Sequence, residues 1–328
     1  MNFSSDTSAP AHPNVLKALA AANTGLEASY GHDAVTQRLR PILADVFSTD
    51  DFDYWLTASG TASNALALSC FCPPTGAVLC HAGAHIAVDE RGAPEFFSGG
   101  GKLHLLRGPD GKIGAAQLDE ALARINHDFV HETPAHVLSL TNLTENGTAY
   151  SVAEVSDYAA KAHATGLVVH LDGARLGNAL VATGASAAEI SWKAGVDVLT
   201  FGLTKTGAMG CEVILLFGEA RQKKRELEAR AKRSGHMPPK MRYLAAQAEA
   251  MLADRLRRMA EGLRRQGVDL AFEPQGNEVF ALLSEAQVSV LHNAGAVFYP
   301  WMGGSQRLVC SWATTPEEVD AFLGVLKG

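Results

Sequence analysis

Short apolar runs alternate with amphipathic segments through the first two-thirds of the chain. The apolar runs are typical of buried strands and lie at residues 77–80, 135–140, 167–171 and 197–201. The segments between them have the apolar spacing of helices and lie at residues 62–70, 115–126 and 152–165. Strands that alternate with helices are typical of a mostly parallel sheet covered by helices. The pattern therefore predicts an α/β fold.

The pattern changes after about residue 240. Pro238 and Pro239 interrupt it, and residues 241–265 then predict one long amphipathic helix. Further apolar runs, with a short helix after the first of them, predict strands at residues 279–283, 296–299 and 307–312. This stretch is typical of a smaller α+β unit.

A last helix is expected to begin at Pro316, because Thr315 can cap its first turn together with Glu318. From these elements we predict two domains. The large domain covers residues 1–240, including an N-terminal arm of about residues 1–25, and the small C-terminal domain covers residues 241–328.

The composition limits the classes of function. The chain has 328 residues, 47% of them hydrophobic, which allows a substantial core and more than one domain. Its net charge of −7 argues against nucleic acid or an anionic membrane as the main partner. The chain opens without a signal-peptide pattern, and charges interrupt its longest apolar stretch, residues 196–217. Five cysteines without a CxxC pair favour the reducing cytoplasm over disulfides or a zinc site.

Two of the predicted strands lead into turns that carry a charged residue. Asp172 comes directly after the strand at 167–171, and Lys205 comes four residues after the strand at 197–201, each in a short polar or glycine-containing turn. Ligands of parallel α/β sheets bind at the carboxyl ends of the strands. A lysine there can bond the aldehyde of pyridoxal 5'-phosphate, and a carboxylate can keep the pyridine nitrogen protonated, so that the ring accepts electrons. Lys205 and Asp172 therefore predict a pyridoxal phosphate site.

A turn of small residues, Ser59-Gly60-Thr61, opens the helix predicted at 62–70. Free backbone N–H groups and the helix dipole favour a phosphate at such a turn. An ordinary helix cap, without any ligand, is the alternative interpretation, and the turn taken alone favours it because such turns are common.

His85 lies just after the strand predicted at 77–80. Its imidazole could stack on a pyridine ring and transfer a proton. Alternatively, His81, His85 and Asp89 are spaced four apart, as three metal ligands on one face of a helix would be, and would then serve a metal-dependent hydrolase. Gly83 and the preceding strand favour a loop here, which argues against the metal site.

Two arginines are candidates for binding a carboxylate. Arg307 begins a predicted strand, and its guanidinium can form two parallel hydrogen bonds with an amino-acid carboxylate. Arg175 follows Asp172 by three residues, and a surface ion pair is its alternative. The basic run at 221–233 includes glutamates and is interpreted as a solvated helix face.

Six motifs occur in a characteristic order along the chain: Phe3-Ser4-Ser5-Asp6-Thr7, Tyr30-Gly31-His32-Asp33, Ser59-Gly60-Thr61, Ala84-His85-Ile86, His170 to Ala179, and Thr204-Lys205. In this order they resemble, nearly from end to end, the low-specificity L-threonine aldolases. That family belongs to the β-eliminating lyase branch of fold-type I pyridoxal phosphate enzymes. The resemblance implies an aspartate-aminotransferase-like large domain and a smaller C-terminal domain.

The resemblance also implies a role for each cofactor residue. Lys205 would hold pyridoxal phosphate, Asp172 would pair with the pyridine nitrogen, and His85 would stack on the ring. Gly60 and Thr61 would hold the phosphate.

Substrate binding and assembly follow from the same resemblance. Arg175 and Arg307 would bind the substrate carboxylate or lie beside the ring oxygen, with help from Ser5. The family forms homotetramers of dimers that share their active sites. The neighbouring subunit's site would then receive Tyr30 and either Lys232 or Arg233.

The implied reaction is a retro-aldol cleavage, which makes the protein a lyase. Threonine or allo-threonine would give glycine and acetaldehyde, and aryl-serines would give aromatic aldehydes. His85 or a water beside it is the candidate base for the β-hydroxyl, with Glu90 as a weaker contributor. The alternatives are another fold-type I reaction, such as β-elimination or transamination, and a protein that binds without catalysis.

Two segments depart from the family pattern. Thr206-Gly207-Ala208-Met209-Gly210 follows the lysine where many members have Gly-Leu-Gly-Ala-Pro. Residues 141–146 read Thr-Asn-Leu-Thr-Glu-Asn where many members have Glu-Asn-Thr-His. A second histidine that could contact the substrate hydroxyl is thus absent, which leaves the base and the preference between threo and allo substrates open.

Overall fold

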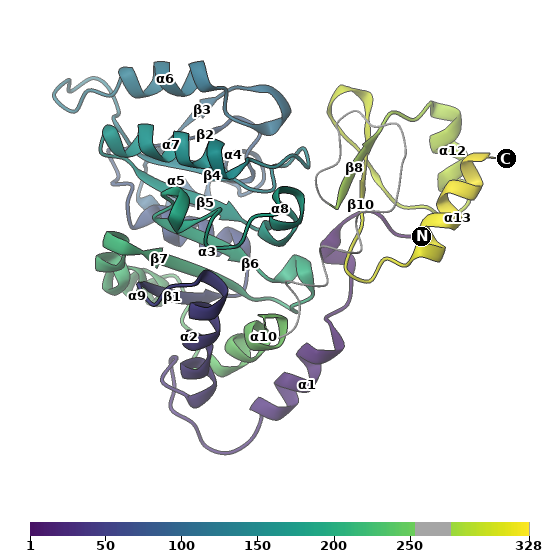
Figure 1. Ribbon diagram of the computed structural model, residues 1–328, viewed down its shortest axis with the longest axis horizontal. Helices are drawn as coiled ribbons and strands as arrows, with labels where there is room; N and C mark the ends of the chain where they lie inside the picture. The colour runs from purple at the N-terminus through teal and green to yellow at the C-terminus, as the bar shows by residue number, and fades with distance from the viewer. Residues whose placement is uncertain (253–276, 328) are drawn as a thin grey trace.

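Figure 1 shows the computed structural model, which describes residues 1–252 and 277–327. Its centre is a sheet of seven strands in the order β1-β7-β6-β5-β4-β2-β3. The strands are β1 (Phe52–Thr57), β2 (Ala77–His81), β3 (Lys102–Leu106), β4 (Ala135–Thr141), β5 (Val168–Gly173), β6 (Val198–Gly202) and β7 (Glu212–Phe217). Strand β7 is antiparallel to both neighbours, and the other neighbouring pairs are parallel. The predicted α/β class and the four predicted strands are confirmed.

The hydrophobic pattern did not predict β1, β3 or β7. Strand β7 is buried along its whole length and lies inside the apolar stretch 196–217. A continuous apolar run has no alternation that would distinguish a strand from a helix. Strand β3 is an edge strand with exposed positions, so its apolar signal is weak.

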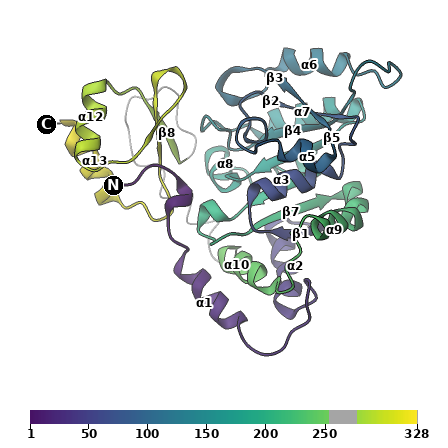
Figure 2. The same ribbon diagram turned by 180° about the vertical axis from the view of Figure 1, so that it is seen from behind.

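Helices cover both faces of the sheet. Helices α3, α5 and α9 lie on the face turned to the viewer in Figure 2, and α7 and α8 lie on the opposite face. The helices of this part of the chain are α1 (Pro13–Ala22), α2 (Ala34–Phe47), α3 (Gly60–Ser69), α4 (His85–Val88), α5 (Ala93–Ser98), α6 (Ala115–Ala123), α7 (Val152–Ala164), α8 (Leu176–Thr183), α9 (Lys224–Arg233) and α10 (Arg242–Leu252). Helices α3, α6 and α7 confirm the three predicted ones.

A second, three-stranded antiparallel sheet has the order β8-β10-β9 and carries two helices (Figure 1). Its elements are β8 (Glu278–Ala281), α12 (Glu285–Asn293), β9 (Tyr299–Pro300), β10 (Gln306–Val309) and α13 (Pro316–Lys327). The cap predicted for the last helix is present: Thr315 Oγ1 accepts from Glu318 N, and Glu318 Oε2 accepts from Thr315 N. The helix predicted at 241–265 begins as α10, and its remainder lies outside the described residues.

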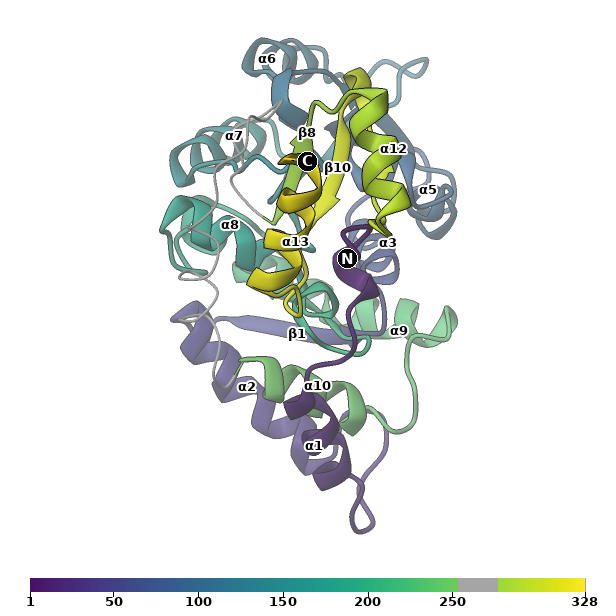
Figure 3. The ribbon, with the colours of Figure 1, turned by 90° about the vertical axis from the view of Figure 1, so that its right-hand side faces the viewer.

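The N-terminal segment joins the two parts of the molecule. Phe3 N donates to Val297 O, and Phe3 packs against Phe322 in the core of the small sheet. The chain then forms a 3-10 turn, η1 (Asp6–Ser8), and continues into α1, which packs against α10. Figure 3 shows the N-terminus beside α13. The domain boundary near residue 240 stays a prediction.

None of the described helices has the length and apolar character needed to cross a membrane. All five cysteines are free thiols.

Candidate active site

The turns after β5 and β6 lie side by side at the carboxyl edge of the sheet. Asp172 pairs with Thr200 across these two parallel strands. A Cβ on Gly202 would lie 2.4 Å from the carbonyl oxygen of Ala174, so only glycine allows the two turns to approach this closely. Lys205 follows in a short 3-10 turn, η4 (Thr204–Thr206), and the two predicted strand ends thus form one site.

The ammonium group of Lys205 has no hydrogen bond or ion pair with any residue that the structure describes. Burial lowers its pKa, and the Arg175 guanidinium lowers it further, against the opposing effects of Asp6 and Asp172. The net pKa is therefore below the ordinary value for lysine. A lysine that gives up its proton more readily is a better nucleophile toward an aldehyde.

Asp172 is fixed by hydrogen bonds to both of its carboxylate oxygens. Asn64 Nδ2 donates to Oδ2 at 2.8 Å, and Ala174 N donates to Oδ1 at 3.0 Å. His170 lies two residues before Asp172 on β5 and is buried, with hydrogen bonds to Ser139 and Thr200. Burial lowers the pKa of His170 to about 4. A neutral imidazole there adds no charge that would compete with a cation beside Asp172.

Asn64 also links Asp172 to the predicted histidine. The same Nδ2 group donates to Glu90 Oε1 at 2.9 Å, and His85 Nδ1 lies 2.8 Å from that oxygen. The hydrogen bond to Glu90 raises the pKa of His85, and burial raises the pKa of Glu90. The sequence pattern did not indicate a role for Asn64, although a polar residue on a helix of small apolar ones is a signal that could have done so.

Glu145, in the loop after β4, contacts the same histidine from its backbone side. His85 N donates to Glu145 Oε1 at 2.7 Å. The second oxygen, Oε2, is buried and has no hydrogen-bond partner among the described residues. Burial raises the pKa of Glu145 to about 7, and the nearby Asp172 carboxylate adds to this effect. The sequence pattern did not indicate that Glu145 would lie beside His85 and Asp172.

The predicted phosphate turn forms the N-terminus of α3. Ser59 caps the helix by accepting from Ala62 N at 3.3 Å. The N–H groups of Gly60 and Thr61 belong to the first helical turn, which has no acceptor within the helix. A Cβ on Gly60 would meet no atom within 4 Å, so there is open space beside Gly60 at the start of this helix.

Arg175 lies in a buried ion cluster, so its interpretation as a surface ion pair is wrong. Its Nε and Nη2 donate to the two oxygens of Asp6 at 2.7 and 3.2 Å, and Nη2 lies 3.3 Å from Glu278 Oε1. Asn277 Nδ2 also donates to Asp6. Glu278 and Asn277 were not predicted from the sequence.

Arg307 reaches the same cluster from β10. Its Nη1 lies 3.9 Å from Glu278 Oε1, and its guanidinium lies 4.9 Å from the centre of the Trp301 ring. Its Nε is buried and has no partner among the described residues. Ser5, which was predicted to assist, hydrogen-bonds instead with the Thr7 hydroxyl at 2.8 Å and caps η1.

The metal-site alternative lacks the geometry that it needs. His81 ends β2 and its Nδ1 accepts from Gly83 N, whereas His85 begins α4 and bonds Glu90. The spacing of four therefore does not place the three side chains on one helix. Within residues 1–252 and 277–327, no group of three or more His, Cys, Asp or Glu side chains could hold a metal ion.

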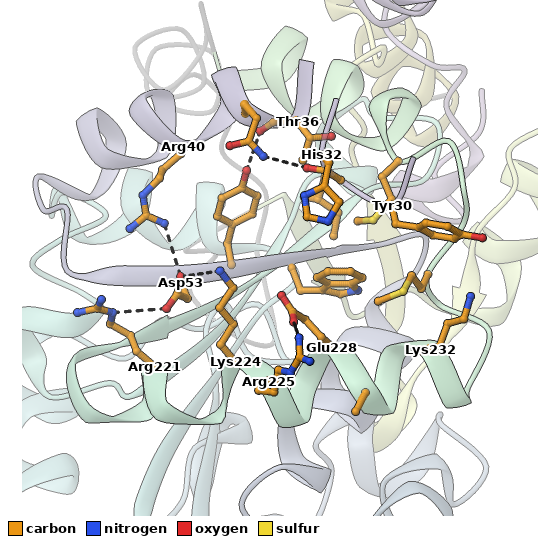
Figure 4. Close-up of a pocket in the computed structure, with 18 of the residues that line it drawn as sticks. Tyr30, His32, Thr36, Arg40, Asp53, Arg221, Lys224, Arg225, Glu228 and Lys232 are labelled. Carbon is orange, nitrogen blue, oxygen red and sulfur yellow. Dashed lines mark hydrogen bonds and ion pairs between the residues drawn. The ribbon is translucent and has the colours of Figure 1, made fainter. Parts of the chain in front are cut away.

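Tyr30, Lys232 and Arg233 do not join this site within one chain. Lys232 Nζ lies 4.6 Å from the centre of the Tyr30 ring, and both residues line a cavity of about 1140 Å³ (Figure 4). The cavity is formed by parts of α2, β1 and α9, and Asp53 binds three basic side chains within it. Lys232 and Arg233 are exposed.

Comparisons with known proteins agree with this geometry. The β-eliminating lyase family model matches residues 2–298. The low specificity L-threonine aldolase of Pseudomonas aeruginosa is 40% identical, over 97% of this chain and 94% of that protein. An enzyme of the same name from a Pseudomonas species is 36% identical over the same shares.

Solved structures give the same result. Leishmania major threonine aldolase aligns with a TM-score of 0.89 and 30% identity, over 99% of this chain and 98% of that one. A serine palmitoyltransferase from S. paucimobilis, with a TM-score of 0.71 and 15% identity over 100% and 86% of the two chains, shares the fold. The chain therefore belongs to the β-eliminating lyase family and, within it, to the low specificity L-threonine aldolases.

Proposed function

We propose that this protein is a pyridoxal phosphate-dependent lyase that cleaves β-hydroxy-α-amino acids to glycine and an aldehyde. Its substrates are L-threonine and L-allo-threonine, with aryl-serines as further candidates. The observation that supports this best is the position of Lys205, which has no partner among the described residues, just after the strand next to that of Asp172, whose two carboxylate oxygens each accept a hydrogen bond. Two arginines lie in the ion cluster next to them.

The residues at the strand ends fit pyridoxal phosphate. Lys205 offers an amine of lowered pKa for the aldehyde, and Asp172 offers a fixed carboxylate for the pyridine nitrogen. Gly60 and Thr61 offer N–H donors and open space for the phosphate. When bound, the protonated ring takes up the electron pair that is left at Cα after cleavage.

The arginine cluster supports binding of the substrate carboxylate. Arg175 is held rigidly by Asp6, and Arg307 keeps an unpartnered Nε donor. Asp6 and Glu278 already balance the charges of the two guanidiniums, so the support comes from the buried Nε–H donor of Arg307, which a substrate carboxylate could bind. Ser5 lies next to Asp6 in the same segment and is retained as a substrate-binding candidate.

His85 has a fixed ring orientation because its Nδ1 bonds Glu90, which leaves Nε2 for a ligand. A ring held in this way can stack on the cofactor. Its raised pKa keeps a larger share of the imidazole protonated near neutral pH. A protonated imidazole cannot accept a proton, which weakens His85 as the base for the β-hydroxyl.

The proposal includes a homotetramer built from dimers that share their active sites. Its support is the exposed basic end of α9, where Lys232 and Arg233 are free to reach a neighbour's phosphate, with Tyr30 packed on Lys232. Cytoplasmic location is part of the same proposal, because five free cysteines fit a reducing compartment.

The test uses the purified protein with added pyridoxal phosphate and L-threonine. We expect a visible absorption band and release of acetaldehyde together with glycine. Release of a keto acid would favour β-elimination or transamination. A protein that stays colourless but loses its activity with a chelator would favour the metal-dependent hydrolase instead.

A further inference from the structure

One carboxylate near the cofactor residues, that of Glu145, has a buried oxygen without a hydrogen-bond partner among the described residues. Glu145 follows β4, which lies between β2 and β5 in the sheet, so its loop lies between His85 and Asp172. Asn142 N in the same loop donates to Asp172 O at 2.9 Å, which attaches the loop to the Asp172 strand.

The loop holds Glu145 in a fixed position. Asn142 exchanges two hydrogen bonds with the backbone of Tyr150, at 3.0 and 3.1 Å, and Thr144 bonds Thr148 through both backbone and side chain. These four residues are buried. The carboxylate itself is oriented by the 2.7 Å hydrogen bond from His85 N to Oε1.

The other oxygen of the carboxylate, Oε2, has neither water access nor a donor from the described residues. Buried carboxylate oxygens are normally hydrogen-bonded, because leaving one unpaired is unfavourable. A donor supplied by a ligand would satisfy it. Of the groups on a β-hydroxy amino acid, the α-amino group would bind the cofactor, the α-carboxylate has no donor and is attracted to the arginines, and the β-hydroxyl has one donor.

We propose that Glu145 is a further catalytic residue, whose Oε2 accepts the proton of the substrate β-hydroxyl. This inference rests on the proposed aldolase function. The raised pKa of Glu145 supports it, because a carboxyl group that titrates at about 7 is a stronger base than an ordinary glutamate and exchanges protons near neutral pH.

The step is balanced in atoms and electrons. The β-O–H bond breaks and its proton goes to Oε2, while the O–H electron pair forms the second bond of the aldehyde carbonyl. The Cα–Cβ bond breaks, and its electron pair, which the bound cofactor would delocalise, forms the new Cα–H bond when Cα takes up a proton and glycine is formed. One proton leaves the hydroxyl and one joins Cα, so no oxidant or reductant is needed.

The test compares E145Q with wild type and with E95Q. Glutamine keeps an acceptor for His85 N but cannot act as the base. Glu95 in α5 is the matched control, because its Oε2 is also buried without a partner among the described residues, yet no hydrogen bond joins it to His85. Each protein is assayed for threonine cleavage, for the visible band of the cofactor, and for exchange of the glycine α-hydrogen in D2O.

Exchange of glycine is the decisive comparison, because glycine has no β-hydroxyl. We expect E145Q to lower kcat for threonine by about 100-fold, within the range of general-base catalysis, with glycine exchange and the visible band unchanged. E95Q should match wild type in all three. A normal kcat in E145Q, or a parallel loss of glycine exchange, would overturn the assignment. Failure of the wild type to release acetaldehyde would instead refute the aldolase function itself.

Discussion

Asp6 and Arg175 form a two-point ion pair across 169 residues of sequence, with Nε–Oδ2 and Nη2–Oδ1 distances of 2.7 and 3.2 Å. The Asp6 side chain is fully buried, and that of Arg175 is 11% exposed. The pair attaches the N-terminal arm to the strand end that carries Asp172. The arm therefore fixes the position of Arg175 beside the strand end that carries Asp172.

We expect D6N to destabilise the folded protein substantially. Breaking a buried ion pair leaves an uncompensated charge and costs about 3–5 kcal/mol. Glu278 still faces Arg175 in the variant, so the cost should lie near the lower limit. D51N is the matched control, because the Asp51–Arg221 pair is solvent-exposed and surface pairs contribute about 0–1 kcal/mol. Urea unfolding at pH 7 measures the stability of both variants. Equal unfolding midpoints for D6N and D51N would contradict a stabilising role of the buried Asp6–Arg175 pair.

The same pair predicts how stability depends on pH. Burial alone would raise the pKa of Asp6, but the Arg175 guanidinium and its hydrogen bonds lower it more, so the net pKa is below 3.8. A carboxyl whose pKa falls on folding contributes stability that is complete above its unfolded pKa of about 3.9 and is lost as the pH falls through the folded value. The difference in unfolding free energy between wild type and D6N should thus be constant from about pH 5 to 7 and shrink below about pH 4. If the difference in unfolding free energy already shrinks between pH 7 and pH 5, a group other than Asp6 causes the pH dependence.

Asn64 should prove important although it touches no reacting atom in the described site. In N64A, the Asp172 and Glu90 oxygens lose a shared donor, and an unsatisfied buried acceptor costs about 1–3 kcal/mol. We expect cofactor affinity to fall by about 30-fold, which corresponds to the middle of that range. S69A, on the same helix but bonded only to the Leu66 carbonyl, should bind the cofactor normally. Spectroscopic titration with pyridoxal phosphate measures both affinities. Equal affinities in the two variants would show that the hydrogen bonds of Asn64 to Asp172 and Glu90 do not support cofactor binding.

Gly60 gives a test of the phosphate position. A Cβ there meets no protein atom, so G60A should leave the melting temperature of the cofactor-free protein unchanged. The methyl group would occupy the space in front of the helix N-terminus, and affinity for pyridoxal phosphate should fall by about 10-fold or more. Pyridoxal, which lacks the phosphate, is the control ligand and should bind equally to both proteins. Equal affinities of wild type and G60A for pyridoxal phosphate would show that the phosphate binds elsewhere.

Mixed assemblies test whether subunits share their sites. K205A lacks the cofactor lysine, and K232A/R233A lacks the cations proposed for the neighbouring site, so each should have little activity alone. Random pairing of the two chains gives half mixed dimers, each with one complete site, and therefore about a quarter of wild-type activity. Co-expressed chains with no more activity than the separate variants would contradict a shared site.

The residues that the sequence predicted best are those at strand ends. Asp172 and Lys205 were predictable because apolar runs identify buried strands, and the carboxyl ends of parallel strands meet at one edge. His85 followed from the same reasoning, whereas Gly60 followed from the free N–H groups at the start of a predicted helix. Predicting the positions of Asp172, Lys205 and His85 requires only the local hydrophobic pattern and the rule that ligands bind at the carboxyl ends of parallel strands.

Contacts between distant segments could not be predicted in this way. Nothing near Asp6 in the sequence indicates Arg175 or Glu278, because their meeting depends on how the N-terminal arm crosses to the small sheet. Asn64 and Glu145 likewise acquire their roles only from neighbours on other strands. Buried polar groups carry no periodic signal, so their partners become visible only in the folded structure.

The central claim is that Lys205 carries a cofactor with which the protein splits β-hydroxy amino acids. The most direct measurement is the yield of acetaldehyde and glycine from L-threonine, with wild type and K205A each supplied with pyridoxal phosphate. We predict equal molar amounts of the two products from wild type, and neither product nor the lysine-dependent visible band from K205A. Products released at the wild-type rate by K205A, or 2-oxobutanoate in place of glycine and acetaldehyde, would contradict it.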